Sequence, residues 1–166
     1  SAPPEFDDLI AARLASLGAD ADDWLRTDPE ALATEEHWDE LDDAPAAVTD
    51  EEFEPLERVG IVLVPVDRPA RLPLVRPFGG GARPSDAELA MLIDRWEGKY
   101  GARPMSMTID SIELFRPSPV ADPDLAAAIA TELAIVAPEI VRQGTETVQE
   151  LAEEIMSRPH WFLWWD

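Results

Sequence analysis

The chain ends in HWFLWWD, residues 160–166, and this stretch decides how the rest of the molecule must be arranged. If it forms a β-strand, its side chains alternate between the two faces of a sheet. One face then takes Trp161, Leu163 and Trp165, and the other takes Phe162 and Trp164. Because burying one large aromatic side chain gains roughly 2–3 kcal/mol, we expect most of these rings to lie in the core.

A second stretch with the same property is VGIVLVPV, residues 59–66. It is short and rich in β-branched residues, which predicts a strand that is apolar on both sides. A strand of this kind is usually covered on both faces. We therefore expect a further layer to lie across the sheet near residues 59–66 and 160–166.

Helix and strand patterns alternate between these two stretches. Residues 86–100 have apolar positions at helical spacing, after a Ser85–Glu88 capping box and before Gly101. Alternating apolar and polar residues on both sides of Asp110 predict a β-hairpin with two one-sided strands.

Two further helices are predicted after Asp122 and after Thr147, and residues 68–84 are expected to form a long loop. The order strand, helix, strand, strand, helix, helix, strand is that of a ferredoxin-like, or split βαβ, fold with one extra helix. We therefore predict an α+β body over residues 59–166, with an antiparallel sheet and helices on one of its faces.

Residues 1–58 are predicted to form a separate acidic helical segment that ends in a linker. They hold 19 acidic and 3 basic residues, a charge of −16, whereas residues 59–166 carry −6. An apolar stripe from Phe6 to Leu17 at helical spacing requires a surface to pack on. We expect this segment to cover part of the sheet face that the helices of the body leave bare.

The formal net charge of the whole chain is −22. Such a surface repels phosphate backbones and anionic membranes, so we expect neither nucleic-acid nor membrane binding. A basic protein would be attracted, although solubility alone could also explain the charge. The expected contact surface consists of Asp39, Glu40, Asp42, Asp43, Asp50, Glu51 and Glu52.

Several kinds of chemistry have no support in the sequence. The chain has no Cys, which excludes disulfides and thiolate metal sites. No calcium loop, phosphate-binding loop or nucleophile elbow is present. We therefore expect no cofactor, no metal and no catalytic residue. The lack of a membrane-spanning or signal-peptide pattern leads us to expect a cytoplasmic protein.

Three stretches carry a further pattern: RWEGKYGARPMSMTIDSIELFRPSP (95–119), PEIVRQGTET (138–147) and HWFLWWD (160–166). Together they resemble the bacterial family called Domain of Unknown Function 4253, over about residues 59–166. The resemblance implies no known activity, cofactor or catalytic residue. The residues that carry it form a candidate pocket or contact site: Trp96, Glu97, Asp110, Glu113, Gln143, Thr145, Trp161, Trp164 and Asp166.

The sequence leaves three functions open. The one it favours is a non-enzymatic protein-binding domain, such as an immunity- or antitoxin-like neutraliser of a basic partner. The second is a small-molecule-binding or hydrolytic enzyme that uses Glu97, Asp110 and Asp166 beside a Trp-lined pocket. The third is a structural protein that forms a homodimer through the open sheet face, so the chain could be a monomer or a homodimer.

Overall fold

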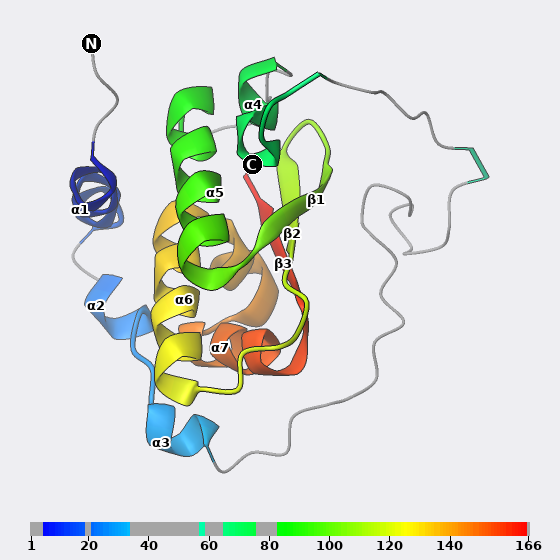
Figure 1. Cartoon of the computed structure of the whole chain (residues 1–166). Coiled ribbons are helices and arrows are strands. Elements are labelled where there is room, and N and C mark those ends of the chain that lie inside the picture. The colour runs from blue at the N-terminus through cyan, green and yellow to red at the C-terminus, as the bar shows by residue number, and fades with distance from the viewer. Residues whose placement is uncertain (1–4, 19–20, 34–56, 59–64, 76–82, 166) are drawn as a thin grey trace.

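The computed structural model describes residues 5–18, 21–33, 57–58, 65–75 and 83–165. These residues form three layers (Figure 1). An antiparallel sheet packs on a layer of three helices, called the long helices below, and the N-terminal helices lie on the far side of that layer. The long helices are α5 (Asp86–Tyr100), α6 (Pro123–Val136) and α7 (Val148–Ser157). The predicted α+β class is confirmed.

The sheet contains three described strands in the order β1-β2-β3, and all neighbours are antiparallel. The strands are β1 (Arg103–Met107), β2 (Ser111–Phe115) and β3 (His160–Trp164). The predicted hairpin and the predicted terminal strand are both confirmed. Residues 59–64 of the other predicted strand lie outside the described residues.

The strand order differs from that of a ferredoxin-like fold. A split βαβ arrangement would place the strand at 59–66 between β2 and β3. Instead, β2 and β3 are direct neighbours along their whole length, from the pair Ser111–Trp164 to the pair Phe115–His160. The order of elements along a chain is compatible with several strand orders. Here the pairing of Ile112 with Leu163 brings two apolar positions together over the helices.

The long helices begin and end where their capping residues predict. The Ser85 hydroxyl accepts a hydrogen bond from the Glu88 amide, and the Glu88 carboxylate accepts one from the Ser85 amide. Gly101 ends α5 in the left-handed region, with φ of 73°. The side chains of Asp122 and Thr147 accept hydrogen bonds from backbone amides in the first turns of α6 and α7.

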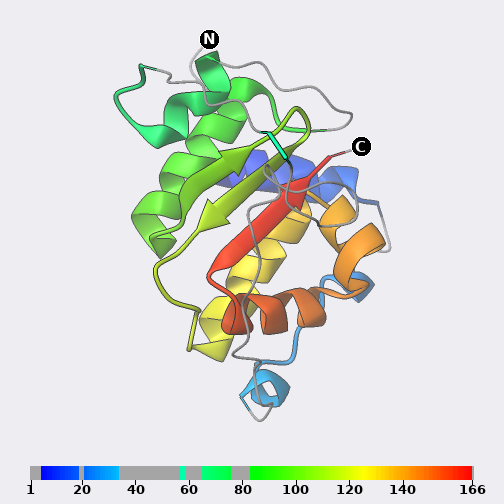
Figure 2. The same ribbon diagram turned by 90° about the vertical axis from the view of Figure 1, so that its right-hand side faces the viewer.

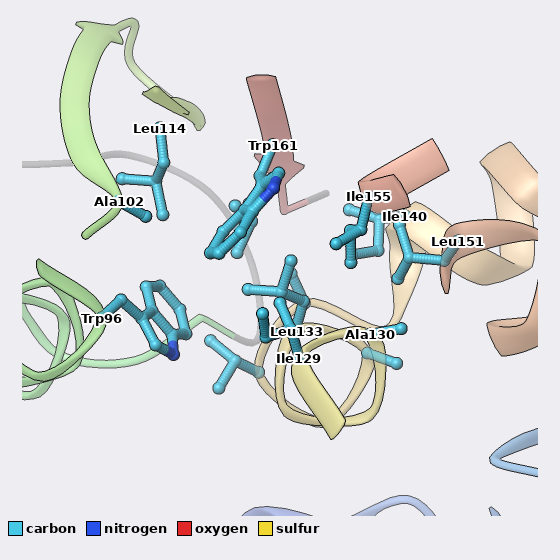
Figure 3. Close-up of a cluster of buried hydrophobic side chains, with 14 of the residues drawn as sticks. Trp96, Ala102, Leu114, Ile129, Ala130, Leu133, Ile140, Leu151, Ile155 and Trp161 are labelled. Carbon is cyan, nitrogen blue, oxygen red and sulfur yellow. The ribbon is translucent and has the colours of Figure 1, made fainter. Parts of the chain in front are cut away.

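The core lies between the sheet and the helical layer. Figure 3 shows Trp161 of β3 among Leu114 of β2 and Ile129 and Leu133 of α6. Trp161 is 3% exposed, and Trp165 is 1% exposed. The Trp165 indole Nε1 donates a hydrogen bond to the Val136 carbonyl at 3.0 Å, which ties the end of the chain to the end of α6.

The stretch predicted as a loop at residues 68–84 contains two short helices, η2 (Pro69–Arg71) and α4 (Leu72–Val75). Both pack against α5, and η2 also contacts β1. The loop prediction is therefore wrong for residues 69–75, where prolines occupy positions that a helix start tolerates.

The N-terminal helices are α1 (Phe6–Ser16), α2 (Ala21–Trp24) and α3 (Pro29–Leu32). They pack on the helical layer, since α1 contacts α5 and α6 and α3 contacts α6 and α7 (Figure 1). The expectation that this segment covers the bare sheet face is wrong for its described part. The physical reason is that α6 is apolar on nearly all sides, so the side that faces the sheet and the opposite side must both be covered.

Specific contacts hold these short helices in place. Leu9 and Leu32 are buried. The Arg13 guanidinium donates to the Val136 carbonyl at 3.2 Å, and burial lowers the pKa of Arg13. The Asp28 amide donates to the Gln149 side-chain oxygen at 2.7 Å. The predicted division of the chain into an N-terminal segment and a body near residue 58 stays a prediction.

Candidate functional site

One face of the sheet points away from the three long helices (Figure 2). We call it the outer face. Because side chains alternate along a strand, the neighbours of the buried Trp161 and Leu163 lie on this face. The outer-face cluster consists of Ser106, Glu113, Phe115, His160, Phe162 and Trp164.

Glu113 lies at the centre of the outer-face cluster. Only 5% of this residue is exposed, and its Oε2 accepts a hydrogen bond from the Ser106 hydroxyl at 2.8 Å. Removing a carboxylate from water is costly unless the group is paired and hydrogen-bonded. The burial of Glu113 and Ser111 also corrects the prediction of a one-sided strand, because β2 is buried on both faces.

His160 is the second titratable member of the cluster. Its Nδ1 lies 3.5 Å from Glu113 Oε1, which is an ion-pair distance but outside hydrogen-bond geometry. Its ring meets the Phe115 ring edge-on, with 5.4 Å between centroids. Since Nδ1 is buried, the 20% of the side chain that is exposed belongs to the rest of the ring. An imidazole that carries its single proton on Nδ1, on the side of this carboxylate, has Nε2 as an acceptor.

Two aromatic rings lie beside these polar groups. Phe162 pairs with Glu113 across the β2–β3 ladder and is 40% exposed. Its ring centroid is 5.5 Å from that of Trp164, with 33° between the planes. Trp164 is partly buried against the core. The outer face therefore combines a buried acid, an oriented imidazole and an exposed aromatic surface.

The ring of Trp164 packs against the turn between α6 and α7. This turn is a π-helix, η3 (Ile140–Thr145), and Glu146 follows it with a positive φ of 66°. A Cβ atom at Gly144 would come within 2.8 Å of the Trp164 ring. The Thr145 hydroxyl donates to the Thr147 carbonyl at 3.0 Å, and Gln143 is exposed on the turn. The sequence pattern Gln-Gly-Thr thus contacts the cluster through its glycine.

Trp96 of the predicted site lies in the helical layer instead. It is completely buried, and its Nε1 donates to Glu132 at 3.3 Å. Tyr100 and Lys99 donate to the same carboxylate at 2.7 and 3.1 Å. Burial raises the pKa of Tyr100, and the hydrogen bond with Tyr100 raises the pKa of Lys99. These groups join α5 to α6 and stabilise the fold.

The carboxylates of the predicted enzymatic site do not converge. Glu97 pairs with Arg103 at 3.2 Å, at the start of β1. Asp110 lies beyond the other end of β1, and the strand from Arg103 to Met107 alone spans about 13 Å. Its side chain accepts a hydrogen bond from the Thr108 hydroxyl at 3.0 Å. The expectation that Glu97 and Asp110 form one site is therefore wrong.

The remaining predicted residues divide into two groups. Trp161 belongs to the core, not to a surface. Asp166 and the seven predicted contact acids lie outside the described residues: Asp39, Glu40, Asp42, Asp43, Asp50, Glu51 and Glu52.

Five members of the arrangement were missing from the predicted site: Ser106, Phe115, His160, Phe162 and Gly144. A signal for Ser106 exists in the sequence, because a hairpin that turns at Asp110 places Ser106 opposite Glu113. No comparable signal exists for His160, since it approaches Glu113 only through the register between β2 and β3.

Within the described parts of the chain, no three His, Cys, Asp or Glu side chains are grouped so that they could hold a metal ion. None of the described helices has the length and apolar character needed to cross a membrane.

Residues 60–166 match the model of a family described as "Domain of unknown function (DUF4253)". The matched range includes the outer-face cluster and all three long helices, whereas α1, α2 and α3 precede it. No curated protein and no solved structure matches the chain.

Proposed function

The chain belongs to the DUF4253 family, and we propose that it is a non-enzymatic protein-binding domain with a basic protein as its partner. The observation that carries this proposal is Phe162. It is a large aromatic residue, 40% exposed in the middle of strand β3, directly opposite a buried carboxylate. Aromatic residues, Phe among them, are enriched at the centre of protein–protein interfaces relative to the rest of the protein surface.

The distribution of charge supports a basic partner. The chain has 13 basic residues, and seven of them form ion pairs within the described parts of the protein. The net charge of −22 already counts every basic residue, so it is left for solvent ions or a partner to balance. Opposite charge on a partner would speed association and favour that partner over acidic competitors.

The same charge disfavours the alternative of a homodimer. Each copy carries a net charge of −22 over the whole chain, so two copies repel one another as they approach. The enzymatic alternative has less support, because Glu97 of α5 pairs with Arg103 at the start of β1 whereas Asp110 follows the end of that strand. Neutralisation of a basic protein, as by an immunity protein or an antitoxin, is one role that suits a binding domain of this kind.

A capture experiment tests this function. The tagged full chain is incubated with a lysate of the organism that encodes it, and bound proteins are eluted with NaCl from about 0.1 to about 1 M. Over this range the Debye length falls from roughly 10 to roughly 3 Å. We expect a basic protein to be retained at low salt and released as the salt concentration rises.

Two variants show whether the outer face is responsible. Phe162→Ser should abolish retention, whereas Leu74→Ser, at a residue 52% exposed on α4, should not. Circular dichroism and thermal unfolding confirm that each variant is folded. Retention of no basic protein, or equal retention by Phe162→Ser, would contradict the proposed function.

A further inference from the structure

The outer face has the features of a site for one arginine side chain. Resting on the proposed function of binding a basic protein, we propose that a guanidinium group of the partner stacks on Phe162 and Trp164 and donates a hydrogen bond to His160 Nε2. Three features of the described residues support this: the ring pair, the buried carboxylate opposite Phe162, and the imidazole that faces this carboxylate.

The ring pair is suited to a cation. A cation within about 6 Å of an aromatic ring is attracted by the negative charge of the ring face. Other aromatic rings of this protein already have such a neighbour: Phe6 has Arg95, Tyr100 has Lys99, and Trp24 has Arg142. No cation of the described residues lies over Phe162 or Trp164. The centroids of these two rings are 5.5 Å apart. A cation of a partner can therefore reach the exposed face of Phe162.

The buried carboxylate supplies the second attraction. Glu113 lies directly opposite Phe162 in the ladder, with 6% of its side chain exposed. Charges interact more strongly near a poorly solvated protein interior than they do in water. Ser106 holds one carboxylate oxygen, and His160 faces the other. A guanidinium above Phe162 would lie within the field of Glu113 without displacing these contacts.

The imidazole explains why we expect arginine and not lysine. Guanidinium is planar and weakly hydrated, so it can stack on a ring and donate hydrogen bonds from its edge at the same time. An ammonium group is compact and strongly hydrated and cannot do both equally well. His160 lies two residues before Phe162 on the same strand, and with Nδ1 turned towards Glu113 and the ring proton there, its Nε2 is the acceptor that a guanidinium needs.

Binding of N-acetyl-arginine amide to the full chain tests this inference directly. The titration is followed at mildly alkaline pH by NMR, using the indole N–H of Trp164 and the backbone amide of Phe162. N-acetyl-citrulline amide has a planar group of the same shape without the charge. N-acetyl-lysine amide has the charge without a planar group. We expect arginine amide to bind about fivefold or more tightly than either control.

Substitutions at the ring and at the acid locate the binding. Phe162→Leu keeps an apolar strand residue but removes the ring, and it should weaken arginine amide binding about three- to tenfold. Glu113→Gln should weaken it as well, while Leu74→Ala should leave it unchanged. If citrulline amide binds as tightly as arginine amide, or if Phe162→Leu has no effect, the inference is wrong.

The outcomes separate this inference from the proposed function. If a captured basic protein depends on Phe162 but arginine amide neither binds nor competes with it, the arginine site is wrong and the binding function stands. If arginine amide binds at Phe162 but no basic protein is captured, the proposed function is wrong and the arginine site stands.

Discussion

The ring of Trp164 lies directly against Gly144, and a Cβ atom at residue 144 would come within 2.8 Å of Trp164 Cη2. Atoms that are not bonded do not approach so closely, so a side chain at this position would push the ring away. The contact joins the turn after α6 to the outer face of the sheet. It explains why a Gly in the turn and a Trp in the terminal strand occur together in this chain.

Gly144→Ala should therefore destabilise the protein by roughly 1–3 kcal/mol, as overpacking does. The matched control is Gly98→Ala in α5, where an added Cβ would meet nothing within 4 Å. That change should stabilise the helix by up to about 1 kcal/mol. Urea unfolding of both variants measures the two effects. Equal effects of the same sign would show that the Trp164 contact is unimportant.

Trp165→Phe should destabilise the protein by about 2–4 kcal/mol. The substitution removes buried volume and leaves the Val136 carbonyl without the indole donor at 3.0 Å. Phe162→Leu, on the exposed side of the same segment, should cost less than about 1 kcal/mol. Thermal unfolding of the pair compares the inner and the outer rings. Equal costs would mean that the outer face is structural.

Leu32→Ala should cost about 2–4 kcal/mol, because this residue of α3 is completely buried against the helical layer. Leu14→Ala in α1, at a residue 38% exposed, should cost less than about 1 kcal/mol. Chemical unfolding followed by tryptophan fluorescence measures both values. A negligible cost for Leu32→Ala would show that the N-terminal helices are not part of the cooperative fold.

Stability should fall in alkaline solution because of Tyr100. Burial raises the pKa of Tyr100, and Lys99 is shifted in the same direction. The folded protein therefore holds these protons to higher pH than the unfolded chain does. The stabilisation is complete below the unfolded tyrosine value of about 10 and is lost as pH rises through the folded pKa.

Tyr100→Phe isolates this effect, because the chain contains a single Tyr. The variant should lose about 1 kcal/mol at neutral pH, through the missing hydrogen bond to Glu132, and should then show a shallower alkaline decline. Phenolate absorbance of the wild-type protein reports the folded pKa. An absorbance transition at or below the pKa of a free tyrosine would contradict the burial argument.

Local structure was predictable from the sequence where one residue determines it. Ser85 and Glu88 predicted the start of α5, and Gly101 predicted its end. The alternation in residues 160–166 predicted which side chains share a face, and Trp161 and Trp165 lie together in the core. These predictions depend only on neighbours in the chain. The expectation that both faces of this strand are covered is wrong at Phe162, which is 40% exposed.

Long-range arrangement was less predictable. The pairing of β2 with β3 joins segments about 45 residues apart, and nothing in either strand specifies its neighbour. His160 reaches Glu113 through this pairing, so the site could be predicted only in part. The position of the N-terminal helices had a signal in the sequence: α6 is apolar nearly all round, which requires cover on both sides.

The most direct test of the account compares two properties of one variant, Phe162→Ser. The account assigns this ring to partner binding and not to the fold. We predict that the free energy of unfolding changes by less than about 1 kcal/mol while retention of the basic partner at low salt is lost. A folded variant that retains the partner as well as wild type does would contradict the central claim.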